Sequence, residues 1–241
     1  MDLAERYRTA VLDGYDSTDR DPGLLPRVLA EACVAILPIA GAGISVTQDL
    51  RVPLGSSDAM ASVAERLQTT LGEGPCLDAV ATPMPLTAGL GVMAVRWPVF
   101  HAELVRLTPY RSVAALPLIP ANGRRLGALD LYLTGSEPMD PQLLFQLANS
   151  IATPMAQILS GAPIEQDLDG ITMPTWLNSD LVRERMQVWS AVGQLMASSA
   201  LENADALALL RAYAYGHETT LDDVAARVVS QSLDVAELLV G

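Results

Sequence analysis

Residues 111–134, RSVAALPLIPANGRRLGALDLYLT, give the sharpest local indication of structure in the chain. Residues 111–117 are apolar and include the β-branched Val113, and residues 124–134 alternate well enough to form a second strand. The residues Ala121-Asn122-Gly123 lie between these runs, and an Asn-Gly pair is typical of the tight turn that joins two paired strands. The stretch therefore predicts a β-hairpin.

Helical periodicity and two further short β-like runs surround this hairpin. Ser57 or Asp58 can cap the helix that follows the first two strands. This mixture of strands and helices predicts an α+β domain, which we place at residues 1–160 with a helix leading into it. The expected helices cover residues 24–39, 59–70 and 140–159, and the expected strands cover residues 44–48 and 50–54.

Residues 161–177 break every periodic pattern, because they combine glycines and prolines with three acids and no arginine. We interpret them as a linker to a second domain at residues 178–241. That domain is predicted to be all-helical, with Thr220 as an N-cap and Asp223 three residues after it. The three expected helices begin at Asn178 or Ser179 and end near Ser199, cover residues 203–215, and cover residues 220–230.

The second domain is small, so its helices bury a thin core and packing against a second copy is expected. Apolar or small residues recur along its first helix at alternating spacings of four and three, which is typical of a seam between helices. We therefore predict a homodimer. The seam residues are Val182, Met186, Trp189, Gly193 and Met196.

Charge and composition exclude several classes of protein. Half of the 241 residues are hydrophobic, which excludes a disordered chain. The 15 cationic residues are all arginine and face 28 acids, so the net charge of −13 disfavours non-specific adhesion to nucleic acid or to an anionic membrane. We find neither a secretory signal nor an apolar run long enough for a membrane span, and two cysteines are too few for a disulfide scaffold. These features predict a soluble, cytoplasmic protein with no membrane partner.

Several short motifs occur together in a fixed order along the chain. Those in the first domain resemble the GAF sensor domains of actinobacterial GAF-ANTAR proteins, over roughly residues 24–159. Those in the second domain resemble an ANTAR domain, the RNA-binding module of transcription antitermination regulators. The first set is GEGPC at 72–76, RWPVF at 96–100, ALPL at 115–118 and LGALDLY at 126–132, and the second is AVGQLM at 191–196, Ala206, Leu210-Arg211, Ala214 and LDDVA at 221–225.

The resemblance implies a GAF domain with a six-stranded antiparallel sheet and helices, followed by a three-helix ANTAR domain. It also implies a dimeric regulator that senses a signal or ligand and binds RNA hairpin loops. A second hypothesis is a small-molecule sensor or dimerisation module without RNA binding. An enzyme is not expected. The free methionine sulfoxide reductases, which have a GAF fold, rely on several cysteines, whereas this chain has only two. A DNA-binding helix-turn-helix is disfavoured by the acidic second domain.

Three residues are candidates for a GAF ligand pocket. Cys76 follows the turn Gly72-Glu73-Gly74-Pro75 at the start of a short helix, where the helix dipole favours a thiolate. The alternative, which we favour, is a structural turn with Cys76 as a small buried hydrophobe. Arg96 is suited to an anionic ligand and Trp97 to a stacked ring, or else Trp97 caps the sheet while Arg96 lies over it. The ligand and any cofactor remain unknown.

Three residues of the second domain are candidates for RNA contacts. Arg211 and Tyr215 lie four apart on the polar side of the second helix, where a guanidinium and a ring together suit unpaired bases. Arg227 adds a cation. The alternative is a solvated arginine over a half-buried tyrosine, and the domain carries only four arginines against nine acids. The two histidines, His101 and His217, fall in different domains, so neither a catalytic nor a metal site is predicted.

Overall fold

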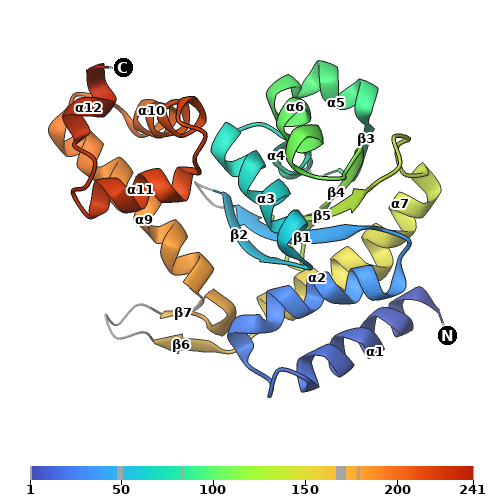
Figure 1. Cartoon of the computed structure of the whole chain (residues 1–241). Helices are drawn as coiled ribbons and strands as arrows, with labels where there is room; N and C mark the ends of the chain where they lie inside the picture. The colour runs from blue at the N-terminus through green and yellow to red at the C-terminus, as the bar shows by residue number, and fades with distance from the viewer. Residues whose placement is uncertain (1, 48–50, 83, 167–171, 178–179, 241) are drawn as a thin grey trace.

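The structure is a computed structural model that describes residues 2–47, 51–82, 84–166, 172–177 and 180–240. A sheet with helices on both faces forms the larger part, and a cluster of helices at the C-terminus lies beside it (Figure 1). Within the described residues no helix is long and apolar enough to cross a membrane.

The main sheet has five strands in the order β2-β1-β5-β4-β3, and all neighbours are antiparallel. The expectation of six strands is therefore wrong for the described part of the chain. The segment that joins β3 to β4 forms two helices, so it contributes no further strand. The strands are β1 (Gly41–Thr47), β2 (Arg51–Ser56), β3 (Leu86–Gly89), β4 (Ser112–Leu118) and β5 (Gly127–Leu133).

The hairpin predicted from residues 111–134 is confirmed as the pair β4–β5, which runs in register from Ser112 opposite Leu133 to Leu118 opposite Gly127. Gly123 adopts a φ of 74°, a left-handed conformation that favours glycine, and its N–H donates to the Pro120 carbonyl over 2.9 Å. The earlier strands pair as β1–β2. The predicted strand ends at residues 48–50 lie outside the described residues.

Helices cover the two faces of the sheet. On one face lie α2, with α1 outside it, and the segment from α7 to α8, while α3 to α6 lie on the other (Figure 1). Helices were predicted for α2, α3 and the α7–α8 segment, and all three are present. The elements are α1 (Leu3–Asp16), η1 (Pro22–Leu24), α2 (Leu25–Ile36), α3 (Ala59–Leu71), α4 (Pro75–Ala81), α5 (Leu90–Arg96), α6 (Pro98–Leu107), α7 (Pro141–Leu147), the π-helical η2 (Ala148–Ala152) and α8 (Thr153–Ser160).

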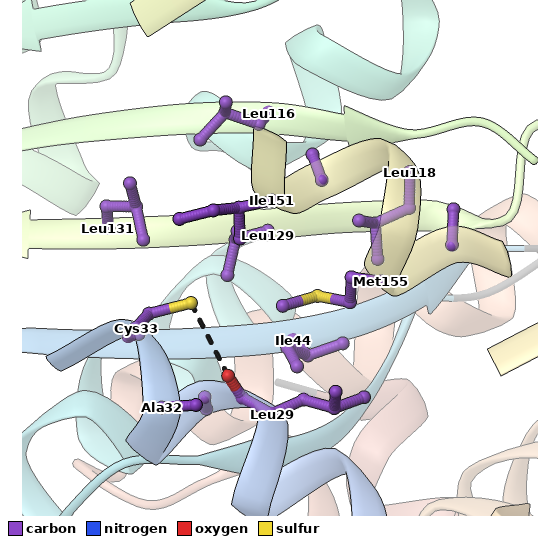
Figure 2. Close-up of a cluster of buried hydrophobic side chains, with 14 of the residues drawn as sticks. Leu29, Ala32, Cys33, Ile44, Leu116, Leu118, Leu129, Leu131, Ile151 and Met155 are labelled. Atoms are coloured by element: carbon purple, nitrogen blue, oxygen red, sulfur yellow. Dashed lines mark hydrogen bonds between the residues drawn. The ribbon is translucent and has the colours of Figure 1, made fainter. Parts of the chain in front are cut away.

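The largest hydrophobic core lies between the sheet and the α2 side (Figure 2). Side chains alternate between the two faces of a strand, so every second residue of β1, β4 and β5 reaches this core. Cys33 of α2 is fully buried there, and its thiol donates to the Leu29 carbonyl over 3.4 Å. The side chains in Figure 2 that carry this packing are Leu29, Ala32, Ile44, Leu116, Leu118, Leu129, Leu131, Ile151 and Met155.

The predicted linker contains ordered structure. A separate antiparallel pair, β6 (Ile164–Gln166) and β7 (Thr172–Pro174), leads into the short helix η3 (Thr175–Leu177). Trp176 is only 3 % exposed, packs into the core of the first domain, and donates its indole N–H to the Leu159 carbonyl over 2.8 Å. The interpretation as a plain linker misses this contact. Burial of one large aromatic side chain stabilises the segment, although the residues around it favour turns.

The C-terminal helices are α9 (Asp180–Ser198), α10 (Asn203–Gly216), α11 (Leu221–Val229) and α12 (Val235–Val240). They share a hydrophobic core of their own. The predicted capping box is present, because Thr220 and Asp223 bond reciprocally at the start of α11. The structure adds a fourth helix to the three predicted, and the expected start at residues 178–179 lies outside the described residues.

The proposed dimer seam is only partly available along α9. Met186 and Met196 are exposed and Gly193 faces open space, as a seam with a second copy requires. Val182 instead packs into the core of the first domain. The expected seam is therefore shorter than the sequence spacing suggests, and the homodimer remains a prediction.

Candidate functional site

A cluster of charged and polar side chains lies buried between the sheet and α3, on the face opposite the core in Figure 2. We call Arg51, Glu65, Gln68, Asp130 and Tyr132 the charged cluster, and each is at most 2 % exposed. Strand alternation places Asp130 and Tyr132 on this face of β5 while their neighbours face the apolar core. The three-residue spacing of Glu65 and Gln68 places both on the inner side of α3.

Arg51, at the start of β2, is the only cation of the charged cluster. Its Nη1 donates to the Glu65 carbonyl and to the Thr69 hydroxyl, each over 2.8 Å. Its Nη2 binds the Glu65 carboxylate and lies 3.5 Å from Oδ2 of Asp130. The guanidinium therefore holds β2, α3 and β5 together.

Gln68 and Tyr132 complete the cluster. Gln68 Nε2 donates to Asp130 Oδ2 over 2.7 Å and to the Tyr132 hydroxyl over 3.1 Å, while that hydroxyl donates to Glu65 Oε1 over 2.6 Å. Gln68 Oε1 accepts from the backbone N–H of Cys76 over 3.0 Å, which ties α4 to the network. Gly43 of β1 makes room, because a Cβ there would lie 2.3 Å from Cδ of Glu65.

The charges of the cluster do not balance unless one acid holds a proton. Burial, and next the neighbouring Glu65, raise the pKa of Asp130 well above its usual value. A protonated Asp130 leaves one guanidinium facing one carboxylate. Among the described residues, Asp130 Oδ1, Arg51 Nε and Ser45 Oγ are buried without a hydrogen-bond partner. This unused bonding capacity and the perturbed acid are features that concentrate at functional sites.

The raised pKa of Asp130 predicts a pH-dependent stability. The folded state holds the Asp130 proton more tightly than the unfolded state does. The stabilisation of the folded state that comes from this proton is therefore complete below pH about 4, and it is lost as the pH rises through the folded pKa. The free energy of unfolding should fall by up to about 1.4 kcal/mol per pH unit in that window. Asp130→Asn should remove this slope in urea titrations from pH 5 to 8. The exposed cap variant Asp140→Asn should keep it, and an unchanged slope in Asp130→Asn would mean that Asp130 is ionised in the folded protein.

Cys76 is placed as predicted at the start of α4, after a turn in which Gly72 and Gly74 have positive φ. Its side chain is 1 % exposed, in agreement with the buried interpretation that we favoured. Burial raises the pKa of the Cys76 thiol, and the lowering effect of Arg51 is smaller. Burial at the helix start therefore favours the neutral thiol of Cys76. Cys33 lies in the hydrophobic core on the other side of the sheet, whereas Cys76 lies beside the charged cluster.

We predict that neither cysteine reacts with a thiol reagent in the folded protein. Burial raises the pKa of Cys33 to about 12, and both side chains are enclosed. Treatment with 5,5′-dithiobis(2-nitrobenzoic acid) at neutral pH should label no thiol in native buffer and two in guanidinium chloride. Cys33→Ser and Cys76→Ser would assign any labelled site. Rapid labelling of native Cys33→Ser would show that Cys76 is reactive after all.

Arg96 and Trp97 lie in different surroundings. Trp97 is 3 % exposed and packs in a hydrophobic cluster with Phe100. The half-exposed Arg96 pairs with Asp78 over 2.8 Å and lies 5.0 Å above the Trp97 ring. This arrangement matches the structural alternative, in which a buried ring is covered by an arginine. The three predicted ligand residues therefore lie in three different surroundings: Cys76 at the edge of the charged cluster, Trp97 in a hydrophobic cluster and Arg96 at the surface.

The structure separates the predicted RNA-contacting residues. Arg211 is not on a free face, since its Nε donates to the Thr69 carbonyl over 3.1 Å and burial lowers its pKa. Its guanidinium also covers Gly72, where a Cβ would lie 2.7 Å from Nη1. Tyr215 is 52 % exposed and Arg227 is exposed. In this structure Arg211 does not share an open face with Tyr215, because α10 packs against α3 at that position, and its role in RNA binding stays a prediction.

A second contact joins the same elements. The backbone N–H of Leu221, at the start of α11, donates to the Thr70 hydroxyl over 3.3 Å. Thr69 and Thr70 are the last buried polar residues of α3, one turn after Glu65. The charged cluster and the C-terminal helices therefore use the same helix.

Sequence reasoning missed the charged cluster. One signal was present, since Asp130 interrupts an otherwise apolar strand at a position that faces inward. Among the described residues, no group of three or more His, Cys, Asp or Glu side chains is arranged to hold a metal ion.

Comparison with known proteins finds similarity to solved structures only, at low sequence identity. No protein-family model matches the chain, and no curated protein matches it. Among solved structures, the chain is similar to a free methionine-R-sulfoxide reductase from Neisseria meningitidis in complex with its substrate, at 16 % identity and a TM-score of 0.43, covering 65 % of this chain and 89 % of that one.

Two further solved structures are similar at the same level. A protein from Burkholderia vietnamiensis described as a GAF sensor has 15 % identity and a TM-score of 0.40, covering 65 % of this chain and 93 % of that one. The GAF domain of a phosphoenolpyruvate-protein phosphotransferase from Coxiella burnetii has 16 % identity and a TM-score of 0.41, covering 62 % of this chain and 94 % of that one. At these values the function of this chain has to be argued from its own residues.

Proposed function

We propose that the chain is a GAF-type sensory regulator in which the first domain receives a signal and the C-terminal helices carry the output. The observation that carries this proposal is the double use of α3. Its inner side supplies Glu65 and Gln68 to the charged cluster, and its last turn supplies Thr69 and Thr70 to the helices α10 and α11. A shift or rotation of α3 therefore changes both sets of contacts at once.

The charged cluster is suited to receive a signal. It contains an acid with a raised pKa and buried polar atoms that have no partner among the described residues. A change of protonation, or a polar ligand that satisfies these atoms, alters the balance between one guanidinium and two carboxylates. Because Arg51 also bonds Thr69, such a change reaches the residue whose carbonyl holds Arg211.

We propose that the output is binding of RNA hairpin loops in transcription antitermination. The motifs of residues 191–225 that resemble an ANTAR domain support this assignment. The exposed Tyr215 offers a ring for stacking on an unpaired base, and the exposed Arg227 offers a phosphate contact. Release of α10 from α3 would add Arg211 to this surface. The contact of Arg211 with Thr69 then acts as a restraint on RNA binding.

The second candidate is a sensor or dimerisation module without RNA binding. The specific observation in its favour is that Arg211 is already engaged with α3 in a domain of net negative charge. The exposed Met186 and Met196 along α9 suit contact with a second copy. Under either proposal the chain is a regulator and not an enzyme.

The RNA proposal predicts that Tyr215→Ala weakens binding of a looped RNA hairpin by the full chain by about 1–3 kcal/mol, because a stacked base is lost. Tyr215→Phe keeps the ring and should bind as the wild type does. Filter binding at low salt measures both variants. Arg227→Ala should also weaken binding and reduce its salt dependence, whereas the exposed Arg124→Ala should not.

Each outcome of this experiment separates the two candidates. Equal binding by Tyr215→Ala and the wild type, with unchanged circular dichroism, places RNA recognition elsewhere on the chain. A wild type that binds none of the hairpins selected from the transcripts of its own source organism at low salt supports the module without RNA binding.

A further inference from the structure

A groove runs beside β2 and α3, and only its narrow end reaches the C-terminal helices. At one end is a hollow of about 480 Å³, bordered by residues of η1, β2 and the first turns of α3. At the other end is a narrow cleft of about 20 Å³, enough for one water-sized group. The two adjoin, because Gly55, Ser56 and Ser62 border both.

The cleft is bordered by Asp222 and by an arginine whose bonding capacity is only partly used. Arg185 of α9 is 3 % exposed, and its Nη2 donates to Oδ2 of Asp222 over 2.7 Å. Its Nη1 is buried and has no hydrogen-bond partner among the described residues. A buried guanidinium N–H without an acceptor is costly, so a native protein seldom keeps one without a reason.

A second arginine borders the same cleft from α3. Arg66 is half-buried and forms no hydrogen bond or ion pair among the described residues. It carries a positive charge close to Arg185, as do Arg51 and Arg211, although the chain as a whole has a net charge of −13. Burial first, and then these three cations, lower the pKa of Arg185 to about 10, while Asp222 opposes them. Asp223 is a further acid that faces Arg66.

We propose that this groove binds a phosphate monoester of a small organic molecule. One phosphate oxygen fits the cleft and accepts from Nη1 of Arg185, and Arg66 neutralises the remaining charge at the mouth. The hydroxyls of Ser56 and Ser62 border both spaces and are available as further donors. Guanidinium groups match phosphate oxygens in geometry as well as charge, which favours this ligand over a neutral one.

The adjoining hollow sets the class of ligand. Its lining combines apolar side chains, such as Leu24 and Leu54, with serines and with the charged residues Arg27 and Asp58. Its volume is in the range of small-molecule sites, so it has room for an organic group attached to the phosphate. Inorganic phosphate would use the cleft and leave the hollow empty. We therefore expect the ester to bind more tightly than phosphate alone.

The bound phosphate would contact α3 through Arg66 and α9 through Arg185. The ligand would then hold the C-terminal helices against the first domain. This inference goes beyond the proposed function, because it concerns a small-molecule site outside the charged cluster and holds whether or not the chain binds RNA.

Isothermal titration calorimetry on the full chain tests the site, with phenyl phosphate as the probe, inorganic phosphate as the smaller anion and phenol as the neutral analogue. We expect one phenyl phosphate per chain, weaker binding of inorganic phosphate, and no binding of phenol. Arg66→Gln should weaken binding of phenyl phosphate by about 10- to 100-fold, since one charged hydrogen bond is lost. Arg124→Gln removes an equal charge from an exposed turn and should have no effect.

Arg185→Lys gives an independent reading. Lysine keeps a positive charge beside Asp222 but has no second nitrogen to replace the unpartnered Nη1, so binding should weaken as in Arg66→Gln. Circular dichroism and the thermal unfolding midpoint confirm that each variant is folded. The proposal is overturned if Arg66→Gln binds as tightly as the wild type, if phenol binds as well as phenyl phosphate, or if phenyl phosphate gives no binding at millimolar concentration.

Discussion

Replacing Arg51 with methionine is expected to lower the free energy of unfolding by about 3–5 kcal/mol. The guanidinium is enclosed by Glu65, Asp130 and Thr69, and its side chain is only 1 % exposed. Removing it leaves the Glu65 carboxylate buried without a cation, and also leaves the Glu65 carbonyl and the Thr69 hydroxyl without this donor. Urea or guanidinium chloride titrations at pH 7 measure the change.

Two variants show whether the loss comes from a buried unpaired charge. Arg27→Met removes an exposed arginine that pairs with Glu31 one turn along α2, and it should cost at most about 0.5 kcal/mol. The double variant Arg51→Met with Glu65→Leu removes both partners and should recover part of the stability. If Arg51→Met costs no more than Arg27→Met, the charged cluster does not hold the strands and α3 together.

Trp176→Ala is expected to lower the free energy of unfolding by about 3–5 kcal/mol, although the residue lies in a segment rich in turn-forming residues. The indole fills a space in the core of the first domain, and its N–H satisfies the Leu159 carbonyl at the end of α8. Its removal leaves a cavity and one unpaired acceptor. Chemical denaturation of the full chain, followed by circular dichroism, measures the loss.

Trp176→Phe separates the two contributions. The phenyl ring fills most of the cavity but cannot donate, so about 1–3 kcal/mol should be lost. Phe145→Ala removes an aromatic side chain that is exposed on α7 and should change stability by at most about 0.5 kcal/mol. A Trp176→Ala variant as stable as Phe145→Ala would restore the interpretation of residues 161–177 as a plain linker.

Local patterns were sufficient for the elements that depend on neighbours in sequence. The β4–β5 hairpin follows from an Asn-Gly turn between two suitable runs, and the capping box of α11 follows from Thr220 and Asp223. The fourth C-terminal helix had a comparable signal, because Oδ1 of Asp234 accepts from the N–H of Ala236 at its start. That helix is short, and its period was too brief to stand out.

The charged cluster could not be predicted in the same way, because its members are far apart in the chain. Asp130 lies 79 residues after Arg51, and no local period connects them. The contact of Arg211 with Thr69 was not predicted for a related reason. A helical projection shows which residues share a side of α10, but it does not show that this side packs against the end of α3. Such contacts are decided by tertiary packing.

The glycine at position 72 controls how closely α10 can approach the end of α3. Because Gly72 has no side chain, the Arg211 guanidinium can pack closely against the end of α3. The φ of 69° at Gly72 is one that other residues rarely adopt. A single substitution at Gly72 would weaken the contact between the C-terminal helices and the first domain without changing a core residue of either part. Under the proposed function, this one position would set how readily the C-terminal helices separate from α3, and therefore how strong a signal is needed.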